Sequence, residues 1–433
     1  MSAVVAVAEP ACIAAAVAPA PASVALLGTG TVGRAVLARL AGWSGTPIGA
    51  RLSLVYAANS RAAVHSRAGL CPRAMQSLAR APVGVRVRRS ADSEFSNAGT
   101  ERTIHLQCIA SANPRPPFGN LLSSASPSGA AGEGSIACAS DLNAVVEVLG
   151  DHATRIVIDA TASDAVAERH AEWLAQGLHV VTACKLGQGA SLARWRAIQA
   201  GCAAGGSRYG DSATVGAGLP LLRCLRELQA GGDRIDAIAG VLSGSLAWLF
   251  NHYDGLRPFS GFVREARDAG YTEPDPRDDL SGEDVRRKLL ILARAAGVAL
   301  EAGDVEVDSL LPPPLAALRR DRVDAALATL DAPLRERYAA AWKSGATLRF
   351  IARLERDPSG AAKARVGLEA LPAGHPLAGG AGTDNRVAIW SDRYRDQPLV
   401  IQGPGAGAAV TAAALLDDAL RIVRSDRAVR GVD

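Results

Sequence analysis

Long apolar runs are missing from this 433-residue chain, and none approaches the roughly 18 residues that a membrane-spanning helix requires. Dense basic blocks are missing too, because the net charge of +4 comes from scattered arginines, so nucleic-acid binding is not implied. The seven cysteines, an odd number, lack the spacing of metal ligands and favour reduced thiols in a cytoplasmic protein. We therefore expect partners of another kind, and a small-molecule substrate fits this composition.

The chain is long enough for two or three domains with sizeable cores, and its hydrophobic content of 48% is typical of a globular protein. The first 22 residues are rich in Ala, Val and Pro and contain no Lys or Arg. A secretory signal would need a basic start, so we interpret residues 1–22 as a flexible tail or an over-extended start. Residues 90–136 lose all periodicity and are rich in Ser, Pro, Gly and Ala, which predicts a disordered insertion in a surface loop.

A dinucleotide-binding motif follows the tail. The apolar run Val24–Leu27 predicts a buried strand, and Arg34–Leu40 has helical character. Between them lies a glycine pattern that permits a tight turn and lets a pyrophosphate approach the backbone at a helix N-terminus. A plain glycine-rich turn is the alternative. The predicted cofactor-binding residues of the motif are Gly28, Thr29, Gly30, Thr31, Val32 and Gly33.

The end of the next strand bears on the choice of cofactor. Leu52–Ala58 reads as a strand, and Asn59 stands at its end, where an NAD enzyme would place a carboxylate. Arg61, close by, could pair with the 2′-phosphate of NADP. The pattern mildly favours NADP over NAD, although Arg61 could also be merely solvated.

Two further strands end in candidate ligand-binding residues. Arg155–Asp159 leads into a short loop, and His179–Thr182 delivers Cys184 and Lys185 at its carboxyl end. In open α/β sheets, ligands bind just outside such strand ends. Cys184, beside a lysine, could be an activated thiolate or a small half-buried residue. A last strand at Leu399–Gln402 leads to a glycine-rich turn and a helix over Ala408–Arg424. Four more segments read as strands, namely Ile235–Val241, Thr347–Leu354, Ala364–Ala370 and Val387–Ser391.

The stretch from Ala266 to Lys288 is rich in acidic residues. Pro274 and Pro276 work against a regular helix, so a loop is expected to carry Glu273, Asp275, Asp278 and Asp279, with a helix starting near Ser281. On that helix Asp284 and Lys288 share one face. Taken alone, these two residues could be a solvated pair.

The whole stretch resembles the signature of homoserine dehydrogenases. That signature is Ala, three residues, Gly, an aromatic or apolar residue and a small residue, followed after a short spacer by Asp-Pro, two residues, Asp-Leu-x-Gly-x-Asp, three residues and Lys. The chain is most similar to the homoserine dehydrogenase part of bifunctional aspartokinase–homoserine dehydrogenases. This resemblance implies an α/β protein with a Rossmann-type dinucleotide-binding domain at 23–186 and an α+β substrate-binding and dimerisation domain with a mixed sheet at 187–401. It also implies that residues 402–433 return to the first domain, and that the protein forms a homodimer.

The resemblance also implies roles for individual residues. Glu273 and Asp279 would bind the amino-acid end of the substrate, and Asp284 would bind it beside Lys288 at the reacting carbonyl. Lys288, Lys185 and Asp284 would be catalytic. Thr161, Ala162, Lys185 and Gly407 would contact the cofactor. Carbonyls of Ser212, Val215, Ala217 and Leu219 would hold a monovalent cation such as sodium, although Ser212 replaces the usual Glu and the glycines could simply shape a turn.

The implied reaction is the reduction of L-aspartate 4-semialdehyde to L-homoserine by NAD(P)H, or its reverse, in threonine and methionine biosynthesis. One alternative is another semialdehyde oxidoreductase that uses Cys184 as a nucleophile. A second is a non-catalytic dinucleotide-binding protein, which would not need Asp284 and Lys288. The family's regulatory modules are not found at either end of this sequence, so insensitivity to threonine is expected.

Overall fold

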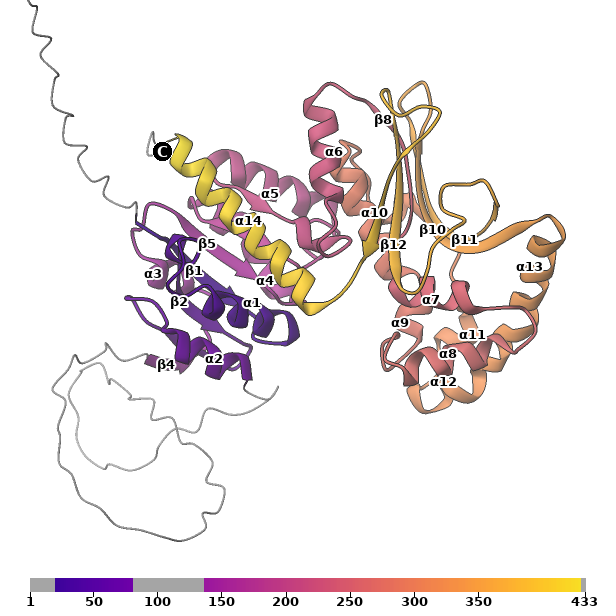
Figure 1. Cartoon of the computed structure of the whole chain (residues 1–433), viewed down its shortest axis with the longest axis horizontal. Coiled ribbons are helices and arrows are strands. Elements are labelled where there is room, and N and C mark those ends of the chain that lie inside the picture. The colour runs from indigo at the N-terminus through magenta and orange to yellow at the C-terminus, as the bar shows by residue number, and fades with distance from the viewer. Residues whose placement is uncertain (1–19, 81–135, 430–433) are drawn as a thin grey trace, which may run out of the picture.

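A computed structural model describes residues 20–80 and 136–429 of the chain. The predicted tail up to residue 19 and the predicted insertion up to residue 135 lie outside these ranges. The described residues form two lobes, and the long C-terminal helix runs back across the first of them (Figure 1). Among the helices of the described ranges, none combines the length and apolar character needed to cross a membrane.

The first lobe is built on a seven-stranded sheet in the order β4-β3-β2-β1-β5-β6-β7. The parallel strands are β1 (Ala22–Leu27), β2 (Leu52–Ala58), β5 (Arg155–Asp159), β6 (His179–Thr182) and β7 (Tyr209–Gly210). The strands β3 (Ala62–His65) and β4 (Ile136–Ala139) extend the edge in antiparallel pairing. Parallel strands are covered on both faces, which explains the continuous apolar run of β1.

Helices cover the two faces of this sheet. Val24 and Leu26 of β1 pack in one core with α1 (Thr31–Gly42), α2 (Pro72–Arg80) and α14 (Ala408–Val429). Ala25 and Leu27 face the opposite core, with α3 (Ala144–Leu149), α4 (Asp164–Ala175) and α5 (Leu192–Gly205). Since α14 completes the first core, the first lobe is built from two separate stretches of the chain.

The predicted domain boundary at residue 186 is wrong. The sheet continues to β7, and α5 packs beside α4, so the first domain extends at least to Gly210. The reason is that one more crossover helix and strand follow β6 before the chain leaves the sheet. The short two-residue β7 carries no apolar run that could reveal it from sequence.

The second lobe contains a six-stranded sheet in the order β13-β12-β8-β10-β11-β9. Its strands are β8 (Ile235–Val241), β9 (Val305–Val307), β10 (Ala346–Arg356), β11 (Ala362–Pro372), β12 (Asp384–Ser391) and β13 (Leu399–Pro404). The strand β9 pairs in parallel with β11, whereas the other pairs are antiparallel, so the expected mixed sheet is confirmed.

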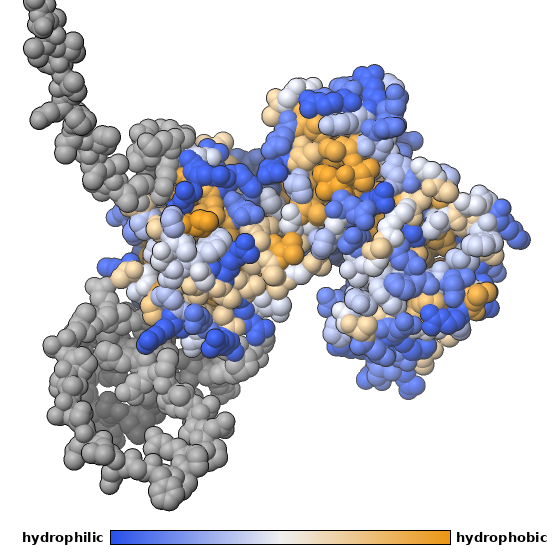
Figure 2. All heavy atoms as spheres, in the orientation of Figure 1, coloured by the Kyte–Doolittle hydropathy of each residue, from blue (hydrophilic) through white to orange (hydrophobic). Residues whose placement is uncertain are grey.

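One large core joins this sheet to its helices. Among them are α6 (Leu221–Ala230), α7 (Gly244–His252), α8 (Phe259–Asp268) and α13 (Asp331–Lys343). The segment that is helical by pattern over 312–344 breaks into α11 (Pro313–Ala316), α12 (Arg320–Ala326), the turn η4 (Leu327–Leu330) and α13. Figure 2 shows apolar side chains gathered on the lobe where α6 and the last strands lie in Figure 1.

The acidic signature stretch is more ordered than its prolines suggested. Asp278 and Asp279 lie on a short helix, α9 (Arg277–Leu280), and not on a loop. The main helix, α10, spans Glu283–Ala295, and Gly282 precedes it with a φ of 79°. Ser281 lies before this glycine and its hydroxyl accepts a hydrogen bond from the Glu283 N–H at 3.2 Å. The expected helix start near Ser281 was therefore two residues early, because the left-handed Gly282 separates the two helices.

Candidate active site

A cavity of about 600 Å³ lies between the two lobes. Its nucleotide-domain wall consists of the residues that follow β1, β5 and β6, where ligands of open α/β sheets bind. The other wall is formed by α10 and by the turn before α14. The predicted residues that line it are Thr31, Val32, Thr161, Ala162, Lys185, Asp284, Lys288, Ala217 and Gly407.

At the centre of this cavity, one carboxylate lies between two lysines. Asp284 Oδ2 is 2.8 Å from Lys288 Nζ, and Asp284 Oδ1 is 3.4 Å from Lys185 Nζ. Lys288 also donates a hydrogen bond of 2.7 Å to the carbonyl of Leu242, at the end of β8. The helix α10 is anchored to the loop after Lys185, since Arg294 donates to the Gln188 carbonyl. The sequence-predicted catalytic residues are thus brought together.

The pKa values of Asp284 and Lys288 are shifted by burial and by their charged neighbours. Burial alone would raise the pKa of Asp284, but Lys288 and Lys185 outweigh it and lower that pKa to about 2. Burial lowers the pKa of Lys288, and Asp284 opposes this effect. The Lys288 side chain is 12% exposed, whereas that of Lys185 is 33% exposed. A buried amine whose pKa is lowered is well suited to exchange a proton.

Next to this cluster, Asp279 organises a second set of polar groups. Its carboxylate accepts hydrogen bonds from the Ser245 hydroxyl at 2.6 Å and from the Glu273 N–H at 2.8 Å. Burial raises its pKa, and these two donors oppose the rise. The Glu273 side chain is exposed. Neither Glu273 nor Asp279 lines the central cavity. Asp279 is nevertheless connected to it, because its partner Ser245 lies three residues after Leu242, whose carbonyl binds Lys288.

The glycine motif has the shape of a pyrophosphate cradle. Gly28 has a φ of 92°, and a Cβ there would lie 2.7 Å from the Ala160 carbonyl oxygen. A Cβ at Gly30, in contrast, would meet nothing within 4 Å, so the backbone is open to an approaching group. The first turn of α1 has no acidic residue and no side-chain cap, which leaves its N–H groups available to an anion. These residues fit a dinucleotide.

Asn59 and Arg61 lie where the ribose of such a dinucleotide is expected. The Asn59 side-chain oxygen accepts the N–H groups of Arg61 and Ala62 at 2.9 and 3.0 Å, which fixes the turn after β2. Its amide donates to the Thr29 hydroxyl at 3.4 Å, within the glycine motif. Arg61 is exposed, and no acidic partner for it lies in the described part of the chain. The turn leaves the guanidinium available to a phosphate.

The residues expected to hold a cation form the turn between β7 and α6. Ala217 has a φ of 50°, so the chain adopts a rare left-handed conformation at a residue other than glycine. No hydrogen bond within the described ranges reaches the carbonyls of Val215 or Ala217, whereas that of Leu219 accepts the Leu221 N–H at 2.8 Å. Ser212 bonds Asp418 of α14 through both its N–H and its hydroxyl at 2.9 Å. The carbonyls of Val215 and Ala217 therefore remain open to a hard cation.

Cys184 does not have the properties of a nucleophile. It is 2% exposed, and burial together with the nearby Asp159 carboxylate raises the pKa of its thiol to about 11. The nearby Lys185 lowers this pKa too weakly to offset the burial. The thiol stays protonated at neutral pH, so Cys184 is better interpreted as a small packing residue, and it is fully buried where a half-buried one was expected.

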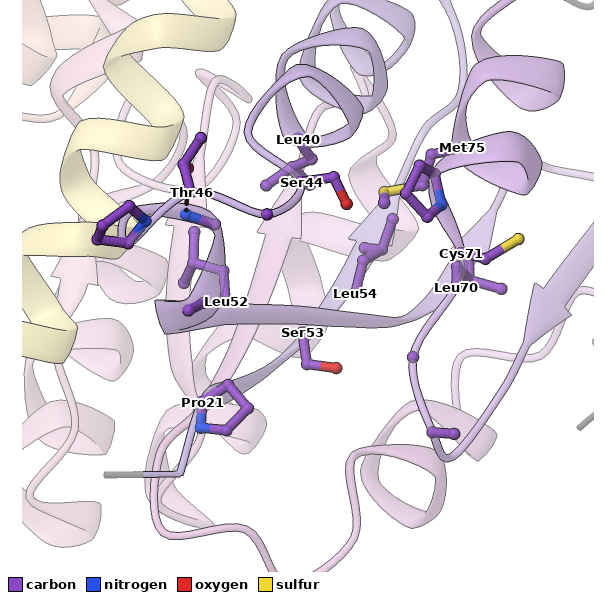
Figure 3. Close-up of a pocket in the computed structure, with 17 residues that line it drawn as sticks. Pro21, Leu40, Ser44, Thr46, Leu52, Ser53, Leu54, Leu70, Cys71 and Met75 are labelled. Carbon is purple, nitrogen blue, oxygen red and sulfur yellow. Dashed lines mark hydrogen bonds between the residues drawn. The ribbon is translucent and has the colours of Figure 1, made fainter. Parts of the chain in front are cut away.

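A second cavity, of about 680 Å³, opens at the opposite end of the nucleotide-domain sheet (Figure 3). Pro21 and Leu52, at the starts of β1 and β2, line it together with Leu70 and Met75. Because ligands of open α/β sheets bind at the carboxyl ends of the strands, this cavity is unsuited to the dinucleotide.

Two features of the site were not predicted from the sequence. The Leu242 carbonyl that holds Lys288 is a backbone group in an apolar run, and Arg287 lines the central cavity from α10. Arg287 could have been found from its position three residues after Asp284 on the same helix. The Leu242 contact depends on how β8 packs against α10, which no local pattern reveals.

The sequence matches two family descriptions: "Homoserine dehydrogenase" over residues 220–420 and "Homoserine dehydrogenase, NAD binding domain" over residues 102–209. A homoserine dehydrogenase of Schizosaccharomyces pombe is 39% identical over 280 residues, covering 63% of this chain and 74% of that protein. A bifunctional aspartokinase/homoserine dehydrogenase of Escherichia coli is 43% identical over 269 residues, covering 62% of this chain and 33% of that protein. The chain thus spans about a third of the length of its bifunctional relatives.

Solved structures share the fold. A protein of unknown function from Candida auris has a TM-score of 0.74 and 29% identity, covering 93% of this chain and 98% of that one. A hyperthermophilic archaeal homoserine dehydrogenase in complex with NADPH has a TM-score of 0.61 and 18% identity, covering 94% of this chain and 98% of that one. With the relative from fission yeast and the matches across both domains, these findings show that the chain belongs to the homoserine dehydrogenase family.

Proposed function

We propose that this chain reduces L-aspartate 4-semialdehyde to L-homoserine with NADPH or NADH, and catalyses the reverse reaction. The observation that carries the proposal is the position of Asp284, which lies between Lys185 and Lys288 in a cavity that also reaches the glycine motif. The reduction needs one proton at the carbonyl oxygen in addition to a hydride. Two ammonium groups beside a bound carbonyl can polarise it and supply that proton.

The amino-acid end of the substrate is assigned to Glu273 and Asp279. Glu273 is exposed, and its backbone is fixed by the Asp279 carboxylate, so its own carboxylate can accept a substrate ammonium. Asp279 holds Ser245 as well, which places a hydroxyl beside the same region. This end of the substrate would fix the distance of its aldehyde from the lysines.

The proton is assigned to Lys288. Its burial lowers its pKa, and Asp284 and the Leu242 carbonyl direct its Nζ. In the reduction, Lys288 Nζ gives a proton to the carbonyl oxygen as the carbon–oxygen π bond breaks, and the neutral amine is later reprotonated from solvent. When bound, the nicotinamide supplies the hydride. Lys185, more exposed and also paired with Asp284, would orient the oxygen.

Three observations support parts of the cofactor and cation assignments. Gly30 and the uncapped first turn of α1 fit the pyrophosphate, and Arg61 fits a 2′-phosphate, which favours NADP. The carbonyls of Val215 and Ala217 would hold the cation, and no step of the reaction depends on it. Thermal unfolding in sodium chloride against choline chloride tests that site without an activity assay, and equal unfolding temperatures would argue against it.

We further propose that the protein forms a homodimer in the cytoplasm. The edge strand β13 exposes Val400, and the apolar patch beside it supports a contact with a second copy (Figure 2). Cys71, Cys184, Cys202 and Cys224 are free thiols, which is the form expected in a reducing compartment. Sedimentation velocity at several protein concentrations tests the dimer, and a monomer at all concentrations would oppose it.

The test of the main proposal is oxidation of NADPH or NADH that depends on added aspartate 4-semialdehyde, with homoserine identified as the product. A nucleophilic role for Cys184 would instead give phosphate-dependent reduction of the oxidised cofactor. The protonated, buried thiol disfavours that outcome. Binding of the cofactor without turnover would support a non-catalytic protein.

A further inference from the structure

Below the loop that carries Lys185 lies a buried polar network that the proposed chemistry does not use. Asp159, at the end of β5, is fully buried, and so is His170 of α4. Tyr209 of β7 completes the network, with its hydroxyl 3.0 Å from His170 Nδ1. Three side chains from separate elements are thus joined inside the nucleotide domain.

The Asp159 carboxylate accepts hydrogen bonds from Thr161, in the loop after β5, and from Thr182, the last residue of β6. Its Oδ1 accepts the N–H and the hydroxyl of Thr161, at 2.9 and 2.7 Å. Its Oδ2 accepts the Thr182 hydroxyl and His170 Nε2, each at 3.1 Å. His170 thus bridges the Asp159 carboxylate, through Nε2, and the Tyr209 hydroxyl, through Nδ1. Burial raises the pKa of Tyr209 well above its usual range, so its hydroxyl keeps its proton.

The network reaches the Lys185 loop on both sides of that lysine. Before it, the Cys184 N–H donates to the Thr182 hydroxyl at 2.8 Å, and Thr182 is held by Asp159. After it, Gly187 lies directly on the far end of the network. A Cβ at Gly187 would lie 2.2 Å from the Tyr209 hydroxyl oxygen and 3.1 Å from His170 Nδ1. The backbone on either side of Lys185 therefore rests on one connected set of buried groups.

We propose that Asp159, His170 and Tyr209 are positioning residues that hold Lys185 at Asp284 and Thr161 at the nicotinamide side of the cavity. None of the three touches the reacting atoms. The loop after β6 is itself largely buried, with Cys184 and Gln188 each 2% exposed, so these hydrogen bonds fix its geometry together with packing. A Lys185 that moves away by about 1 Å would cost about 100-fold in rate, since reacting groups must be closely aligned.

The inference rests on the proposed function, and the experiment separates the two. The chain has four lysines, namely Lys185, Lys288, Lys343 and Lys363. Lys343 and Lys363 are exposed, so they serve as internal references for chemical labelling. The rate of reductive methylation of Lys185, measured by peptide mass spectrometry, reports its environment without any turnover.

Asp159→Asn keeps the shape of the side chain but places an NH₂ group against donors. We expect kcat to fall by about 10- to 100-fold with a smaller change in KM, and Lys185 to be methylated several-fold faster relative to Lys343. Tyr209→Phe, which removes only a hydroxyl, should change both quantities in the same direction by a smaller factor. It keeps the test decisive if Asp159→Asn does not fold.

The matched control is Asp426→Asn, which breaks another His–carboxylate pair of the same domain. Asp426 Oδ2 lies 2.9 Å from His179 Nε2 and 3.1 Å from the Thr154 hydroxyl, away from the cavity. This variant should lose stability but keep its kcat and its Lys185 labelling rate. Unchanged labelling of Lys185 in both network variants, or an equal change in Asp426→Asn, would overturn the proposal. Faster labelling of Lys185 in the network variants, together with a wild type that does not turn over the semialdehyde, would instead uphold the proposal while refuting the proposed function.

Discussion

Replacing Lys288 by alanine removes the amine to which the proton transfer is assigned. Its Nζ makes two contacts, to Asp284 Oδ2 at 2.8 Å and to the Leu242 carbonyl at 2.7 Å. A general acid contributes about 10²- to 10⁴-fold to a rate, which corresponds to about 2.7–5.4 kcal/mol of barrier. We therefore expect kcat to fall by at least about 100-fold.

The same change should affect binding and folding much less. Glu273 and Asp279, assigned to the amino-acid end, are untouched, so KM for the semialdehyde should change by less than about tenfold. The Leu242 carbonyl loses its donor, which costs about 1–3 kcal/mol of folding free energy, and Asp284 keeps Lys185 as a partner.

Steady-state kinetics with NADPH measure both constants, and thermal unfolding checks the fold. Lys343→Ala, at an exposed lysine of α13, is the matched control and should leave kcat unchanged. A Lys288→Ala enzyme with a kcat within a few-fold of the wild type would refute the assignment. A loss that appears only in KM would move Lys288 from proton transfer to substrate binding.

Further predictions concern the cofactor, the substrate and the pH dependence. Arg61→Ala should weaken NADPH binding about tenfold or more and leave NADH binding nearly unchanged, since a charge-assisted contact contributes about 1.5–3 kcal/mol. Equal losses of affinity for the two cofactors would mean that Arg61 only supports its loop. Asn59→Asp should erode the same preference, because it places a like charge beside the phosphate while its oxygen still accepts the turn's N–H groups; an unchanged NADPH/NADH ratio would argue against it. Asp279→Asn should raise KM by roughly tenfold, with kcat affected less, through the lost charge at Ser245 and the Glu273 backbone. The kcat of reduction should fall as pH rises through the Lys288 pKa, which lies below the usual lysine value of 10.5, and the reverse rate should rise over the same range; a pH-independent kcat would contradict this.

Most elements of the nucleotide domain could be predicted because their signals are local. The apolar runs of β1, β2, β5 and β6 are continuous, as expected for strands covered on both faces, and glycines mark the first turn. The strand β3 and the edge strand β7 are short and have no such run, so both were missed, and with β7 the full extent of the sheet.

The catalytic residues could be predicted in part. The spacing of Asp284 and Lys288 places both on one face of α10, so their contact follows from helix geometry. The approach of Lys185 to the same carboxylate depends on how the two lobes pack, which the resemblance supplied and the local pattern did not. The buried bonds of Asp159, Thr182 and Cys184 had no sequence signal, because each residue type is common at strand ends.

The most direct test of the central claim traces the transferred hydride by isotope and compares the wild type with Lys288→Ala, which lacks the assigned proton donor. The enzyme is mixed with aspartate 4-semialdehyde and NADPH that carries deuterium at the transferred position, and the product is analysed by mass spectrometry after a single turnover. We predict homoserine with one deuterium on the former aldehyde carbon, formed rapidly by the wild type and at least about 100-fold more slowly by Lys288→Ala. Homoserine without deuterium, an acid product, or equal rates for the two enzymes would contradict the account.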